Sequence, residues 1–150
     1  AIGQCGDAVV TGTLTGHIYI WESRNCIQTI KAHSGAVTSM YISMDEEGGM
    51  ITGSTDGKVT LWTKDLEMGA TFDIQALGCV NRSIQSVCWA REQNKLLVAT
   101  AGAEIYEIDD AEGLQLHKGA LQIGHCNLET WGTAVNPVKL NEYVSVGDDK

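Results

Sequence analysis

The sequence predicts an all-β protein, a fragment of a β-propeller with about three four-stranded antiparallel blades and incomplete at both ends. An internal repeat, short β-branched segments bounded by glycine, and 17 glycines beside one proline all favour this fold. A four-stranded blade repeats about every 40–45 residues, whereas ankyrin and tetratricopeptide arrays repeat about every 33–34. Abundant glycine with so little proline indicates tight turns between strands.

The repeat is clearest in residues 11–21 and 52–62, which align without a gap at an offset of 41 (62 − 21 = 41). Each segment begins with Thr-Gly, contains a second glycine and ends in tryptophan. A weaker third copy spans residues 100–108, where Ile108 stands in place of the tryptophan and one loop position is shifted. The offset falls in the range of a propeller blade.

A second motif, with small or apolar residues, begins at Val37, Ile84 and Trp131 (84 − 37 = 47; 131 − 84 = 47). His33 and His125 precede its first and third copies. Because a propeller usually closes with about four to eight blades, we expect a piece of a longer chain whose remaining blades complete the ring. The single domain, residues 1–150, is expected to contain a blade remnant at about 1–24 and blades at about 25–65, 66–110 and 111–150.

Strands are expected wherever β-branched or aromatic residues alternate between turn signals. Gly48-Gly49 and Asp56-Gly57 are hairpin-turn dipeptides, and residues 109–113 form a solvated turn. The expected strands are approximately 8–12, 18–22, 27–31, 36–43, 49–54, 58–63, 70–74, 83–90, 95–100, 104–108, 115–123, 130–136 and 142–147.

Composition narrows the classes of function. The net charge of −9 disfavours binding to nucleic acid and to anionic membrane surfaces. No apolar run approaches the roughly 18 residues that a membrane span needs. The cysteines have irregular spacing without a Cys-x-x-Cys pair, so we expect reduced thiols, no zinc site and a cytoplasmic location. They are Cys5, Cys26, Cys79, Cys88 and Cys126.

One repeat carries a set of polar residues that can form a hydrogen-bond relay: His33, Thr52, Asp56 and Trp62. A histidine before the first strand can donate to an aspartate in a turn, a threonine hydroxyl can bridge inward, and an indole N–H can end the relay. The same residue types could form a His–Asp–Thr catalytic triad. Since these positions recur with the blade period, we interpret the set as structural.

The other repeats keep only part of this set. The first retains Thr11 and Trp21 but has Thr15 in place of the turn aspartate. The third lacks both the tryptophan and the turn aspartate. The order of His33, Thr52, Asp56 and Trp62 in the second resembles the WD40 repeat, so the predicted fold is a WD40-type β-propeller.

No other residues indicate catalysis, a metal site or a cofactor. His17 and His117 each stand alone, and residues 45–47 are acidic but lie in an expected loop before two glycines. Motifs for phosphate-binding loops, zinc proteases and serine hydrolases are missing. We therefore expect a protein that is not an enzyme.

The last part of the chain resembles the echinoderm microtubule-associated-protein-like family. Residues 124–137, with Glu129, Trp131 and Gly132, are similar to the Glu-x-Trp-Gly segment of that family, and residues 143–150 are similar to the strand that follows it. The resemblance implies a tandem atypical propeller that binds tubulin and microtubules in the cytoskeleton. Because tubulin surfaces are acidic, binding by a chain of charge −9 requires local complementary patches.

Two other hypotheses remain beside a tubulin-binding scaffold. One is a generic WD40 adaptor for another protein complex. The other is an enzyme with its active site at the central channel, which small and apolar inner-strand residues disfavour, among them Val37, Ser39, Ile84 and Ser86. The sequence does not assign the residues that contact a partner.

Overall fold

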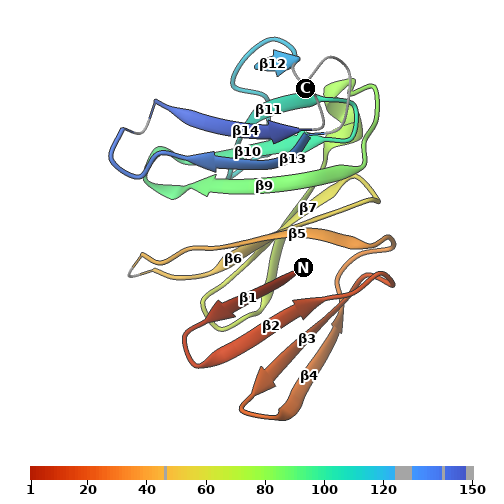
Figure 1. Ribbon diagram of the computed structural model, residues 1–150, viewed down its shortest axis with the longest axis vertical. Coiled ribbons are helices and arrows are strands. Elements are labelled where there is room, and N and C mark those ends of the chain that lie inside the picture. Colours follow the sequence, from red (N-terminus) through yellow and green to blue (C-terminus); the bar gives the residue numbers. More distant parts are fainter. Residues whose placement is uncertain (46, 124–129, 140, 148–150) are drawn as a thin grey trace.

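The computed structural model describes residues 1–45, 47–123, 130–139 and 141–147, which form antiparallel β-sheets (Figure 1). Three sheets have four strands each and a fourth has two. In Figure 1 the four-stranded sheets follow one another from the bottom of the view to the top, in chain order. Among the described residues the sheets do not close into a ring, and no helix is long and apolar enough to cross a membrane.

Strands follow one another in each sheet in the order of the chain. The first sheet contains β1 (Ile2–Cys5), β2 (Ala8–Gly12), β3 (His17–Glu22) and β4 (Asn25–Lys31). The second contains β5 (Val37–Ile42), β6 (Met50–Ser54), β7 (Lys58–Trp62) and β8 (Met68–Asp73). The third contains β9 (Ile84–Ala90), β10 (Lys95–Thr100), β11 (Glu104–Asp109) and β12 (Gln122–Ile123), and the last contains β13 (Thr130–Val135) and β14 (Tyr143–Gly147). Short 3-10 turns span Ile74–Leu77 and Arg91–Gln93.

The all-β propeller fold is confirmed, but the sheets do not begin and end where we expected the blades. The first sheet has four strands and extends to Lys31, beyond the blade remnant expected at about residues 1–24, and its strand β1 was not predicted. Its segment contains Gly3 and Gln4 and lacks a β-branched alternation. β4 closes the first sheet and not the second, because the recognisable repeat starts in the outer strand of one sheet and ends in the third strand of the next.

The expected strand at 115–123 is mostly irregular. Only β12 is a strand, although the preceding segment follows β11 through isolated hydrogen bonds, with Leu116 N donating to Glu107 O at 3.1 Å and Leu121 N to Ile105 O at 2.7 Å. Gly119 has φ +83°, which turns the chain away from an extended path. Each of the other expected strands lies within two residues of an observed one at either end.

Apolar layers between neighbouring sheets form the core. Alternate residues of the second sheet face opposite ways, as the period of a strand requires. Met50 and Trp62 pack with Val10 of the first sheet. Ile51 and Val59 pack in a second layer against the third sheet. A third, smaller layer joins the third sheet to β13 and β14.

The inner strands of neighbouring sheets approach closely. A Cβ on Gly53 would lie 2.6 Å from Ile84 Cγ2, so only glycine fits at this position of β6. Beside it the Ser39 hydroxyl accepts a hydrogen bond from Val87 N at 3.0 Å, and the Ser86 hydroxyl accepts one from Thr133 N at 3.0 Å. The same serine position thus joins β5 to β9 and β9 to β13.

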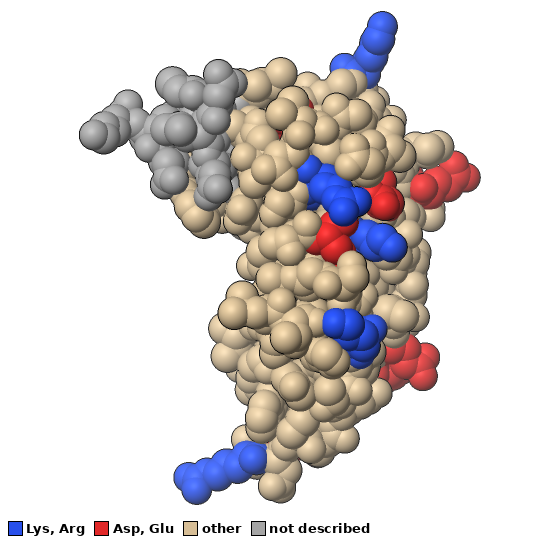
Figure 2. Space-filling model, turned by 90° about the vertical axis from the view of Figure 1, so that its right-hand side faces the viewer, with Lys and Arg blue, Asp and Glu red and all other residues tan. Residues whose placement is uncertain are grey.

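The strand directions divide the turns between two rims of the molecule. We call the first the linker rim; it holds the loops that join the sheets, residues 32–36 and 74–83, together with the β2–β3, β6–β7 and β10–β11 turns. The other turns, such as β5–β6 and β9–β10, lie on the opposite rim. In Figure 1 the linker rim is on the right, and Figure 2 looks onto it.

Four cysteines lie in the described part of the chain, all as free thiols. Cys79 and Cys88 are buried, Cys5 is half-buried in β1 and Cys26 is exposed in β4. Burial raises the pKa of the Cys79 and Cys88 thiols. Cys126 lies outside the described residues.

Candidate functional site

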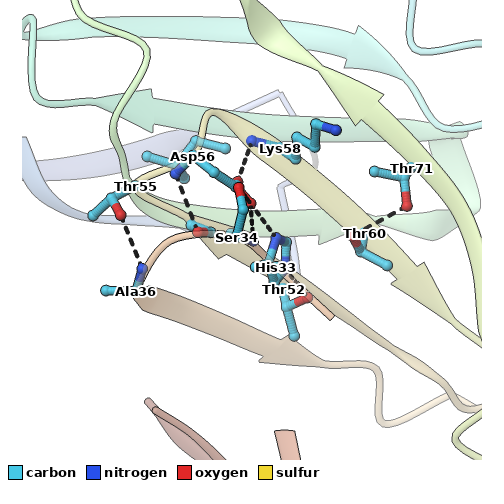
Figure 3. A network of polar contacts seen from close by, with 12 residues as sticks. His33, Ser34, Ala36, Thr52, Thr55, Asp56, Lys58, Thr60 and Thr71 are labelled. Carbon is cyan, nitrogen blue, oxygen red and sulfur yellow. Dashed lines mark hydrogen bonds and ion pairs between the residues drawn. The ribbon is translucent and has the colours of Figure 1, made fainter. Parts of the chain in front are cut away.

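The second sheet brings His33, Thr52, Asp56 and Trp62 together. Figure 3 shows the first three of these residues. Trp62 Nε1 donates to Thr52 Oγ1 at 3.0 Å. The Thr52 hydroxyl lies 2.9 Å from His33 Nε2, and His33 Nδ1 lies 3.4 Å from Asp56 Oδ2. The last separation exceeds that of an ordinary N–H···O hydrogen bond, so this contact is the weakest of the three.

Each of the four residues reaches this site from a different element. Thr52 lies on β6 and Trp62 on the neighbouring strand β7. Asp56 lies in the β6–β7 turn, which Gly57 closes with φ +81°. His33 comes from the loop that leads into β5. The site therefore ties the loop, the turn and the sheet to one another.

The Asp56 carboxylate is held mainly by backbone donors. Ser34 N donates to Oδ2 at 2.8 Å, Lys58 N donates to Oδ1 at 2.9 Å, and the Ser34 hydroxyl is 3.2 Å from Oδ2. Burial by itself would raise the pKa of Asp56, but these N–H donors and the nearby His33 lower it below its usual value. Asp56 is therefore ionised at neutral pH.

His33 is neutral in this arrangement. Burial lowers its pKa below the usual 6.5, and the attraction of Asp56 offsets only part of that effect. The tautomer with its proton on Nδ1 suits both neighbours, because Nδ1–H then faces the carboxylate and Nε2 accepts from Thr52. All donors then run in one direction, from Trp62 through Thr52 and His33 to Asp56.

We expect the stability of the protein to fall as the pH is lowered from 7.5 to 5.5. The unfolded His33 binds a proton near pH 6.5, while its folded pKa is lower, so the unfolded state gains protons first and is favoured. For one proton the slope is at most about 1.4 kcal/mol per pH unit. Urea unfolding at both pH values measures this loss. The His33→Gln variant should show a flatter dependence, and an equal dependence in both proteins would contradict the assignment to His33.

The geometry does not suit a catalytic triad. The Thr52 side chain is completely buried, and its hydroxyl already contacts both Trp62 and His33. The His33 side chain is also inaccessible to solvent. A substrate cannot reach a nucleophile in this position, whereas a buried, linked polar network suits fixing of a loop.

The first sheet retains one bond of this network. Trp21 Nε1 donates to Thr11 Oγ1 at 2.9 Å. At the turn, Thr15 takes the place of Asp56, and its hydroxyl lies 3.0 Å from His17 Nδ1. The partial sequence match therefore corresponds to a partial network.

The third sheet uses a different solution that sequence alignment missed. Glu104 is 5% exposed; its Oε2 accepts from Val80 N at 2.9 Å, and its Oε1 accepts from the Tyr106 hydroxyl at 3.0 Å. This carboxylate thus holds its preceding loop as Asp56 holds Ser34. Burial, followed by the contact with Glu104, raises the pKa of Tyr106. Because β11 also contains Glu107 and Asp109, no sequence signal singled out Glu104.

The strand register also corrects the alignment of Thr100. It occupies the place of Ser54, because Val98 pairs with Tyr106 as Thr52 pairs with Thr60. Val98 therefore stands where the relay threonine would be. The two apolar residues Val98 and Ile108 replace the Thr–Trp bond of the second sheet.

Other residues considered at the sequence level lie apart. Asp45 and Glu47 are exposed in the β5–β6 turn, and His117 Nε2 lies 2.6 Å from Glu107 Oε2 at the surface. The described residues contain no group of three or more His, Cys, Asp or Glu suited to a metal ion. Of the segment that resembles the microtubule-associated family, Trp131 and Gly132 lie on β13, while His125 and Glu129 fall outside the described residues.

The exposed charged side chains of the linker rim are mostly positive, although the whole chain is acidic. Lys31, Lys58 and Arg82 are exposed there. Of the carboxylates that the structure describes there, Glu104 is buried, the side chain of Asp56 is 7% exposed, and Asp73 is exposed. Exposed apolar side chains accompany the cations, with Leu14 at 87% and Val80 at 85%. Much of the rim seen in Figure 2 carries no charge.

The opposite rim is acidic. Its carboxylates outnumber its cations Arg24, Lys64, Arg91, Lys95 and Lys139. They are Asp7, Glu22, Asp45, Glu47, Asp65, Glu67, Glu92, Asp109, Asp110, Glu112 and Glu142. The charge of the described residues is therefore unevenly distributed between the two rims.

Comparisons with known proteins agree with this architecture. Residues 24–63 match the family model described as "WD domain, G-beta repeat". The chain is similar to WD repeat-containing protein 3 of Homo sapiens (42% identical over 60 residues) and of Mus musculus (40% over 60 residues). These matches cover 39% of this chain and 6% of each relative.

A solved structure described as "Crystal Structure of Mitotic Checkpoint Complex" contains a similar fold. The two folds superpose with a TM-score of 0.77, and the sequences are 17% identical. The match covers 98% of this chain and 44% of the chain in that structure. At this identity the likeness shows the fold alone. The chain thus contains a WD40 repeat and has the fold of a WD40 propeller, whereas the comparisons do not support membership of the microtubule-associated-protein-like family.

Proposed function

We propose that this stretch of WD40 propeller is a non-catalytic scaffold that binds an acidic protein surface through its linker rim. The observation that carries the proposal is the set of exposed cations Lys31, Lys58 and Arg82 on a chain whose net charge is −9. Charge complementarity over a rim steers association and selects partners. WD40 propellers in general serve as scaffolds for protein partners.

The cations come from neighbouring parts of one surface. Arg82 lies over the β6–β7 turn, since a Cβ on Gly57 would be 2.9 Å from Arg82 Cδ. Lys58 follows that turn directly. Lys31 at the end of β4 donates from Nζ to Thr15 O and so extends the patch onto the first sheet. Exposed Leu14 and Val80 supply apolar contact beside these charges.

Tubulin is the partner that we propose, with a cytoplasmic, cytoskeletal location. Two considerations support it: residues 124–137 and 143–150 resemble the microtubule-associated family, and tubulin surfaces are acidic. The exposed cations of the linker rim lessen the conflict between an acidic chain and an acidic partner, because contact depends on the local charge. A generic WD40 adaptor is the second candidate, supported by relatives whose names state only WD repeats.

Co-sedimentation with microtubules tests the proposal. We expect binding that weakens at least tenfold in the Lys58→Glu/Arg82→Glu variant, because glutamates then replace two cations of the rim and repel an acidic partner. Raising the salt concentration from about 50 to about 200 mM should weaken wild-type binding only moderately, since few cations take part.

The Arg24→Glu/Lys139→Glu variant is the matched control, with the same change of charge on the opposite rim. Its affinity should stay within twofold of wild type. Absence of binding at both salt concentrations would exclude tubulin as the partner and leave the generic WD40 adaptor as the proposed function. Binding that is insensitive to the rim variant would show that the linker rim is not the contact surface.

A further inference from the structure

A cleft of about 830 Å³ opens on the opposite rim between the second and third sheets. Leu61, Trp62 and Trp89 contribute its apolar part. Trp62 and Trp89 are both anchored by their indole nitrogens, which donate to Thr52 Oγ1 at 3.0 Å and to Asp110 Oδ2 at 2.9 Å. Because both sheets have all four strands, the cleft does not depend on any further blade.

Carboxylates surround this apolar surface. Asp45 and Glu47 line one side, and Glu92 and Asp110 line the other. Hydrogen bonds from the Ser43 hydroxyl, above all, and from Gly48 N lower the pKa of Asp45, although burial opposes this, so Asp45 is charged at neutral pH. The lining contains more negative than positive groups, since its cation is Arg91.

Arg91 shows how the cleft accommodates a guanidinium group. Its Cζ lies 4.3 Å from the centre of the Trp89 ring, in a cation–π contact. Its Nη1 is 3.3 Å from Asp45 Oδ1 and also donates to Gly48 O, and its Nε is 3.5 Å from Glu47 Oε2. Arg91 therefore forms an ion pair with Asp45 and covers one face of the Trp89 ring, while Glu92 is exposed beside them.

We propose that this cleft is a second docking site, which binds a peptide segment of a partner protein that combines arginine or lysine with large apolar side chains. The cations would lie against Glu47 and Glu92, and the apolar side chains chiefly against Leu61, which is half-buried, since Trp89 is only 6% exposed. Charge complementarity selects this occupant, because an acidic segment would be repelled by the rim of the cleft. The site is independent of the linker rim and of tubulin.

Fluorescence anisotropy with labelled heptapeptides tests this proposal. We expect the protein to bind a heptapeptide that alternates arginine and leucine, and not one that alternates glutamate and leucine. A peptide alternating arginine and glycine should bind at least fivefold more weakly than the arginine–leucine peptide, because it lacks side chains that contact the apolar part of the cleft. The Glu47→Lys/Glu92→Lys variant should weaken the arginine–leucine peptide at least tenfold.

The control is Asp7→Lys/Glu22→Lys, which makes the same change of charge at exposed positions of the first sheet on the same rim. It should stay within twofold of wild type. An equal loss in both variants would show attraction by overall charge and overturn the proposal. So would failure of the wild-type protein to bind the arginine–leucine peptide. Circular dichroism verifies that both variants fold.

Discussion

The Trp62→Ala variant should lose about 3–5 kcal/mol of unfolding free energy, the usual cost of truncating a buried large aromatic residue. Trp62 is 2% exposed and packs with Met50 and Val10 in the layer between the first two sheets. The truncation leaves a cavity and also removes the donor to Thr52 Oγ1. Urea unfolding followed by far-ultraviolet circular dichroism measures the loss without relying on tryptophan fluorescence.

Two further variants separate packing from hydrogen bonding. Trp62→Phe retains most of the ring and should lose only about 1–2 kcal/mol, as expected for one hydrogen bond and a small volume. Trp21→Ala removes the equivalent bond to Thr11 in the first sheet, where the ring is only half-buried, and should cost less than Trp62→Ala. A loss below about 1 kcal/mol in Trp62→Ala would mean that this layer does not hold the two sheets together.

The Asp56→Ala variant should be destabilised by about 1–3 kcal/mol, because it strips acceptors from groups that the fold has already oriented. Ser34 N and Lys58 N lose their carboxylate partner, and the buried Nδ1 of His33 loses the carboxylate that it faces. The stability of Asp56→Asn should lie between those of the wild type and Asp56→Ala, since an amide oxygen retains acceptor capacity without the charge. Thermal unfolding at pH 7.5 ranks the three.

Asp109→Ala provides the comparison for Asp56. Asp109 Oδ1 also accepts from two backbone groups, Ala111 N at 2.9 Å and Glu112 N at 2.8 Å, but these bonds are exposed and involve no buried histidine. Its loss should be under about 1 kcal/mol. If Asp56→Ala left stability unchanged and abolished a chemical activity, the relay would be catalytic and the structural interpretation wrong.

Local chemistry explains why the sequence predicted the strands and the four residues of the relay so directly. Asp56-Gly57 ends one strand and begins another, and the His33–Trp62 spacing is specific enough to place the loop, turn and sheet around a single site. β1 escaped prediction because its pairing with β2 is a tertiary property of a segment that contains Gly3 and Gln4. A strand of this kind is defined by its neighbour.

Features that depend on strand register or on the direction of the strands could not be predicted from the sequence. Glu104 replaces Asp56 from a different position in the repeat, and only strand register shows that Val98 stands where Thr52 does. The unequal charge of the two rims follows from the direction in which each strand runs. Composition reports the sum of those charges and hides their separation.

The serine contacts between inner strands have a mechanical consequence. Within a sheet, neighbouring strands share a ladder of backbone hydrogen bonds, whereas Ser39 and Ser86 supply single side-chain links from one sheet to the next. Between the second and third sheets the Thr38 hydroxyl also donates to Ile84 O at 2.5 Å, and Arg91 pairs with Asp45. Much of the remaining contact is apolar, including the close fit at Gly53. Under a pulling force, neighbouring sheets should therefore separate from one another before the strands within a sheet do, so that each sheet is released as a unit.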